Sequence, residues 1–185
     1  MNDDRGHISL LVPPSTQDLM QGVLSAKVVL VMYGDYQSSR NAEVYKLIQV
    51  IKRELSASFE EDYLCFIFRH FPQIQIHPHA QRAAQAAIAA AAQGQFWSMH
   101  DTLFVHQQNL ENGYLIEYAN DLGLDIPRFL KDLPKQVHLD RIKEGIEGGI
   151  RSGVTIAPAL FINGSRYTGH WNTTQLLAAV LAASQ

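Results

Sequence analysis

The sequence predicts an α/β fold: a central mixed β-sheet with an inserted helical subdomain. Two apolar runs, 28–33 and 63–68, flank a segment with helical spacing, and the first run is rich in β-branched residues. Together they predict a strand–helix–strand unit whose two strands are parallel neighbours. Several helical segments follow, and after them comes a strand that ends at Asn163-Gly164, a strong hairpin signal.

The first strand is closed by Gly34-Asp35, so Asp35 and Tyr36 lie between this strand and the first helix. The helix is predicted over residues 38–55, because one stripe of it is apolar, formed by Val44, Leu47, Ile48 and Ile51. Ser38 and Ser39 can each cap its N-terminus, since a hydroxyl accepts a hydrogen bond from an unpaired backbone N–H.

The helical insert is predicted at about residues 78–152, with helices over 80–93, 96–106, 115–122, 127–133 and 137–152. A strand beginning just past Pro158 follows the insert, and residues 166–168 are predicted to return antiparallel to it. The final helix is predicted over 171–183, with Thr173 or Thr174 as its cap. A chain of 185 residues has the length of one ordinary domain, so we expect residues 1–185 to form a single domain.

Composition excludes several classes of function. The formal net charge of −3 and the pI of about 6.2 give no basic footprint for nucleic acid. No stretch approaches the roughly 20 apolar residues that span a membrane, so we expect no membrane partner. One cysteine cannot form an intrachain disulfide, and the N-terminus carries acids where a signal peptide carries basic residues. These features predict a cytoplasmic protein.

Five segments, in the right order, resemble the DsbA-like thioredoxin-fold family. They are Tyr33-Gly34-Asp35-Tyr36-Gln37, then Phe68-Arg69-His70-Phe71-Pro72 with His77-Pro78-His79-Ala80, then 94–101, 122–125, and 153–158 with 161–164. Within this family, the chain resembles small bacterial DsbA-like domains that occur alone or fused to sodium/proton antiporters. The resemblance implies a thioredoxin fold with a DsbA-like helical insert, and a cis peptide bond between Ala157 and Pro158.

The resemblance also implies a Cys-x-x-Cys at the start of the first helix, where this chain has Ser38-Ser39-Arg40-Asn41. Disulfide exchange needs a thiolate that attacks a sulfur, which neither serine nor asparagine supplies. We therefore expect dithiol–disulfide oxidoreductase activity to be lost. Cys65 lies in an apolar strand and is expected to be a small buried hydrophobe.

Three interpretations of this position stay open. Ser38 and Ser39 can be caps left after the active site decayed. In a glutathione-dependent transferase or isomerase, the Ser38 hydroxyl would bond the thiolate of glutathione, the one cofactor this interpretation needs. In a peptide- or partner-binding protein, the backbone of Ala157 beside the helix N-terminus would pair with an extended peptide in a cis-proline groove. Arg40 would then favour an acidic ligand, unless it is only a solvated surface charge.

The same groove could also support a homodimer. The eight histidines suggest a metal site, but the sequence has no His-Glu-x-x-His motif and no cysteine partners. We expect no metal, and surface, capping or structural roles for the histidines, which include His70, His77, His79, His100 and His106.

Overall fold

The computed structural model describes residues 8–59 and 63–185, and its contacts group the chain into two compact units. The sheet unit contains the chain up to Tyr33, Glu43–Arg69 and Gly148–Gln185. The helical unit contains Gly34–Ala42 and His70–Glu147. The acidic N-terminal residues 1–7, on which the predicted location partly rests, lie outside the described residues.

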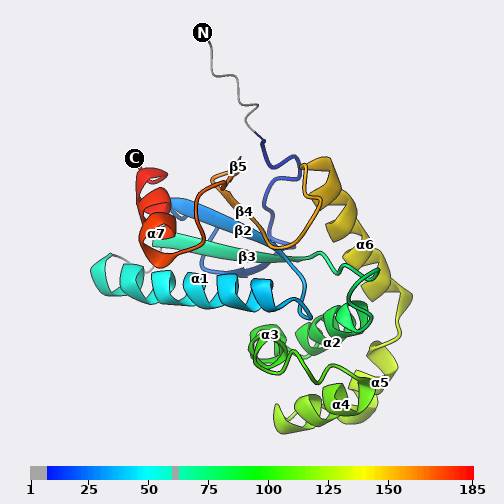
Figure 1. The fold of residues 1–185 in the computed structure, drawn as a ribbon. Coiled ribbons are helices and arrows are strands. Elements are labelled where there is room, and N and C mark those ends of the chain that lie inside the picture. The colour runs from blue at the N-terminus through cyan, green and yellow to red at the C-terminus, as the bar shows by residue number, and fades with distance from the viewer. Residues whose placement is uncertain (1–7, 60–62) are drawn as a thin grey trace. The chain divides into compact units, whose positions relative to one another are not determined.

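The sheet unit confirms the predicted central mixed sheet (Figure 1). Its five strands have the order β1-β3-β2-β4-β5 and are β1 (Leu19–Gln21), β2 (Val28–Gly34), β3 (Leu64–His70), β4 (Ala159–Ile162) and β5 (Ser165–Arg166). β2 and β4 are antiparallel, with Tyr33 opposite Ala159. β3 is buried along its whole length and β2 nearly so, as expected for continuous apolar runs in the middle of a sheet.

Helices α1 (Ser39–Ser58) and α7 (Thr173–Ala182) lie together beside these strands in Figure 1. The predicted Thr173 and Thr174 cap of α7 is wrong. Asn172 is the N-cap, and its side chain accepts a hydrogen bond of 2.9 Å from the Gln175 backbone N–H. Asparagine is preferred over threonine at N-cap positions, where a side-chain oxygen accepts a hydrogen bond from a backbone N–H of the first turn.

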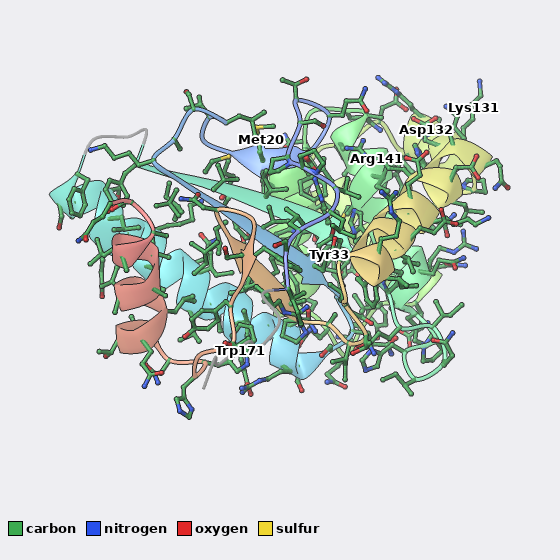
Figure 2. The ribbon with its side chains drawn as sticks, turned by 90° about the horizontal axis from the view of Figure 1, so that it is seen from above. Met20, Tyr33, Lys131, Asp132, Arg141 and Trp171 are labelled. Carbon is green, nitrogen blue, oxygen red and sulfur yellow. The ribbon has the colours of Figure 1, made fainter. Side chains whose placement is uncertain are left out.

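A buried ion pair holds the N-terminal segment against the sheet unit. Arg69 on β3 donates from Nε and Nη2 to the Asp18 carboxylate at 2.8 and 2.9 Å, and also to the carbonyls of Val12 and Pro13. Arg69 also donates to the hydroxyl of Tyr33, which Figure 2 labels together with Met20 on β1. Burial lowers the pKa of Arg69, but its bonds to Asp18 and Tyr33 outweigh burial and raise it.

The helical unit contains most of the predicted insert. Between β3 and β4 the chain forms α2 (Ala80–Ala91), α3 (Phe96–Val105), α4 (Asn112–Asp121), α5 (Ile126–Asp132) and α6 (Gln136–Arg151). The alanines of α2 are almost all buried, so their small side chains serve close packing. No helix in the described part of the chain is long and apolar enough to cross a membrane.

Candidate functional site

The turn between β2 and α1, with the start of α1, contains Ser38-Ser39-Arg40-Asn41, the residues at which the resemblance implies a Cys-x-x-Cys. The carbonyl of Ser38 accepts hydrogen bonds from the backbone N–H groups of Asn41 and Ala42, at 3.1 and 3.3 Å. Ser38 therefore has the backbone role of an N-cap, and the helix proper begins at Ser39. The structure thus places residues 38–41 at a helix N-terminus, where the sequence predicts the first helix to begin.

The four residues differ sharply in exposure. Ser38 is 9% exposed and Asn41 is fully buried, whereas Ser39 and Arg40 are exposed. The side-chain oxygen of Asn41 accepts a hydrogen bond of 3.1 Å from the backbone N–H of Asp35. Asn41 is therefore a structural tie across the turn.

Asp35 is the centre of the polar contacts in this turn. Its carboxylate is buried and accepts hydrogen bonds from the backbone N–H groups of Gln37 and Gln73 and bonds the Nδ1 of His77, each at 2.8 Å. With its oxygens bonded in this way, the carboxylate holds the segment after β3 against the turn before α1. The structure therefore gives Asp35 a positioning role in this turn.

Two further side chains fix the turn, and sequence reasoning assigned a role to neither. Gln107, after α3, donates from Nε2 to the carbonyls of Tyr36 and Ser38, at 2.6 and 2.8 Å. Gln37 accepts from the backbone N–H of His79 at 2.8 Å. Neither glutamine has a local pattern that marks it, because each acts on backbone groups about 40 or more residues away.

Tyr36 points into the core of the helical unit. It is 1% exposed, and its hydroxyl lies 2.7 Å from Nδ1 of His100. Its ring also packs against Phe104 and His70, with centroids 4.9 and 5.7 Å apart. Burial, assisted by Arg141, lowers the pKa of His70 to about 3, so His70 is a neutral core histidine at neutral pH.

The sheet unit contains the predicted proline segment. The peptide bond between Ala157 and Pro158 is cis, and β4 begins at the next residue. Ala157 is 4% exposed, whereas Ile156 is 58% exposed and Thr155 is also exposed. The segment before β4 therefore shows solvent a large apolar side chain next to the proline.

The single thiol of the chain, that of Cys65, is not exposed for disulfide exchange. Cys65 is fully buried in β3 and forms no disulfide. Burial raises the pKa of its thiol, and the charge of Asp18 raises it further, while Lys52 lowers it. A thiol with a raised pKa is poor in thiolate, the species that attacks disulfides.

The histidines that the structure describes do not gather into a metal site. His77 bonds Asp35, and His79 Nε2 lies 4.0 Å from Glu111 Oε1. Within residues 8–59 and 63–185, no group of three or more His, Cys, Asp or Glu side chains could hold a metal ion.

Comparison with known proteins gives relatives over nearly the whole chain. The sequence model of a family described as thioredoxin matches residues 15–182. The protein named Na(+)/H(+) antiporter NhaA 1 from Salinispora arenicola is 38% identical over 179 residues, which are 96% of this chain and 26% of the relative. The Na(+)/H(+) antiporter NhaA from Herminiimonas arsenicoxydans is 34% identical over 178 residues, 95% of this chain and 27% of the relative. The chain spans about a quarter of the length of these curated relatives.

Solved structures show the same fold. Alpha-DsbA1 from Wolbachia pipientis gives a TM-score of 0.79 at 16% identity and covers 94% of each chain. A thioredoxin-like oxidoreductase from Silicibacter pomeroyi gives 0.78 at 20% identity, with 91% of this chain and 93% of that chain covered. BdbD from Bacillus subtilis gives 0.77 at 15% identity, with 96% and 98% covered.

Proposed function

We propose that this chain, which belongs to the thioredoxin family and has a DsbA-like thioredoxin fold, binds a peptide or protein partner without dithiol–disulfide chemistry. The observation that carries the proposal is the structural role of the Asn41 side chain. Its side chain is buried and bonded to the Asp35 backbone, at a position where the resemblance implies a cysteine. With Cys65 buried in β3 as the chain's one thiol, no pair of thiols remains to form and break a disulfide.

The segment before β4 supports the binding part of the proposal. Exposed isoleucine is favourable for contact with an apolar partner side chain, since covering it removes apolar surface from water. Ile156 stands in an exposed segment directly before the Ala157–Pro158 bond. An extended partner segment that lies along residues 155–157 could combine this apolar contact with backbone hydrogen bonds.

The redox part of the proposal is tested by reduction of insulin disulfides with dithiothreitol as the electron donor. We expect no turnover above the uncatalysed rate, because the turn has no thiolate. The double variant Ser38→Cys/Asn41→Cys is the positive control and should gain measurable turnover, since it returns two thiols to a helix N-terminus. Turnover by the unaltered chain at a rate comparable to that variant would contradict the proposal.

The binding part is tested with reduced, carboxymethylated α-lactalbumin, an unfolded polypeptide that has no reactive thiols. Its affinity is measured by fluorescence anisotropy for the unaltered chain and for Ile156→Asp. We expect the aspartate to weaken binding about tenfold or more, because it removes apolar contact area and adds a charge that must be desolvated. Ile150→Asp is the matched control, because Ile150 is a comparably exposed isoleucine of the sheet unit, 60% exposed. Equal losses in the two variants would count against a site at residues 155–157.

The glutathione-dependent interpretation has weaker support. It requires the Ser38 hydroxyl to reach a bound thiolate, but Ser38 is only 9% exposed and its carbonyl is held by Gln107. Calorimetry with millimolar reduced glutathione separates the two interpretations. Heat of binding that Ser38→Ala abolishes would favour the enzyme over the binding protein.

A cytoplasmic location belongs to the same proposal, because a chain with one buried cysteine needs no oxidising compartment. The names of the curated relatives add a candidate partner, a sodium/proton antiporter. The chain matches about a quarter of the length of each of these relatives, which are named as sodium/proton antiporters. Transport itself is not proposed for this chain.

A further inference from the structure

A row of stacked aromatic rings lies at the surface of the helical unit, where α3 meets α4. Tyr114 and Tyr118 are one helical turn apart on α4, with ring centroids 6.4 Å apart and an interplanar angle of 24°. His106, directly after α3, stacks on Tyr118 at 5.1 Å and 29°. Tyr114 is 41% exposed and Val105 is 73% exposed. The row therefore presents aromatic and apolar surface to solvent.

This part of the chain has only negative formal charges. From Ala83 to Pro127 the sequence contains no lysine or arginine. The same stretch contains five exposed carboxylates, those of Asp101, Glu111, Glu117, Asp121 and Asp125. Basic residues resume at Arg128, and Figure 2 labels two of those that follow, Lys131 on α5 and Arg141 on α6.

Two of these carboxylates lie near the stacked rings. The pKa of the Tyr118 hydroxyl is raised, first by burial and then by the charges of Glu117, Tyr114 and Glu111. The Tyr118 hydroxyl donates to the carbonyl of Asn109 at 2.9 Å, which fixes the middle ring of the row. Glu111 is 54% exposed, with the imidazole of His79 at 4.0 Å as its neighbouring titratable group.

We propose that this face of α3 and α4 binds an arginine-bearing segment of a partner protein, with a guanidinium over the Tyr114 ring and near the Glu111 and Glu117 carboxylates. A guanidinium is planar, weakly hydrated and always charged, so it stacks on an aromatic ring and pairs with a carboxylate at the same time. An acidic segment would be repelled by the same carboxylates. The inference concerns a different surface from residues 155–157, and it stands or fails independently of the proposed function.

The test measures binding of a fluorescein-labelled nonapeptide of alternating arginine and glycine by anisotropy. The buffer has pH 8 and low salt, so that imidazoles are ordinarily neutral and screening is weak. We expect saturable binding that weakens as salt is raised. The matched lysine–glycine peptide should bind less tightly, because an ammonium is strongly hydrated and lacks a planar face. A glutamate–glycine peptide should not bind.

Three variants of the full chain locate the site. Tyr114→Leu keeps apolar bulk but removes the ring, and should lower the affinity about two- to fivefold. Glu117→Gln removes one neighbouring charge and should also lower it. Glu144→Gln on α6 makes the same change of charge outside the acidic stretch, and should leave the affinity unchanged.

Absence of binding by the arginine peptide would overturn the inference. So would equal losses for Glu117→Gln and Glu144→Gln, because they would indicate a general attraction to a protein of negative net charge. Equal affinities of the arginine and lysine peptides, or no effect of a folded Tyr114→Leu variant, would also overturn it. Should circular dichroism show that Tyr114→Leu does not fold, the comparison of the two glutamate variants decides.

Discussion

At the scale of single residues, the turn at 35–41 is held together by buried polar side chains. Asn41 bonds the Asp35 backbone, and Asp35 in turn bonds the segment that follows β3. The sequence predicted the helix N-terminus from local signals, namely the closing Gly34-Asp35 and the two serines. The bond from Gln107 to the Ser38 carbonyl could not be predicted, because Gln107 is 69 residues away along the chain.

His70 gives a prediction at this scale. Its pKa is about 3 in the folded chain, because burial disfavours the charged imidazole, while an unfolded histidine has its ordinary value near 6.5. Between these values the unfolded chain binds a proton that the folded chain does not. The free energy of unfolding therefore falls as the pH falls from about 6.5 toward 3, by up to about 1.4 kcal/mol per pH unit from this group.

Urea unfolding from pH 7 to pH 4 checks this, with His70→Phe as the comparison. Phenylalanine fills similar space without titrating, so the variant should lose stability less steeply in acid. His138, whose pKa is also lowered by burial, titrates in both proteins and cancels in the difference. Identical slopes in the two proteins would contradict the assignment to His70.

At the scale of elements, helices and strands with long apolar patterns were predicted well, and short ones were not. β1 has three half-buried residues and was missed as a strand, since so short a segment shows no alternation. The start of α4 was predicted at residue 115 but lies at Asn112, where polar residues begin the helix before its apolar face. The hairpin return is β5 at Ser165–Arg166, slightly earlier than residues 166–168.

The cap of α7 gives the prediction at this scale. Asn172→Ala removes the bond to the Gln175 N–H, and should lower the free energy of unfolding by about 1 kcal/mol. Thr174→Ala is the control, and its effect should stay within about 0.5 kcal/mol, as for an exposed residue without a capping role. Chemical denaturation measures the loss of unfolding free energy in both variants, provided that this free energy depends on denaturant concentration with the same slope in each protein. A larger loss of stability for Thr174→Ala than for Asn172→Ala would contradict Asn172 as the N-cap and favour the threonine cap predicted from the sequence.

At the scale of the whole molecule, the chain divides its chemistry between two compact units. The sheet unit holds Cys65 and the Ala157–Pro158 bond, and the helical unit holds the Asp35 turn and the acidic face of α3 and α4. The sequence predicted the order of elements, since each has a local pattern. It could not show that residues 34–42 group with α2–α6, because that grouping arises from contacts between distant segments.

The burial of Cys65 gives the protein a built-in reporter of its own unfolding. A fully buried thiol near the start of β3 reacts with an alkylating reagent only when the surrounding strands open, so each modified molecule records one opening event. Since the chain has no other cysteine, the labelling rate comes from a single place and needs no engineered probe. The labelling rate of Cys65 therefore measures the local stability of the sheet around β3.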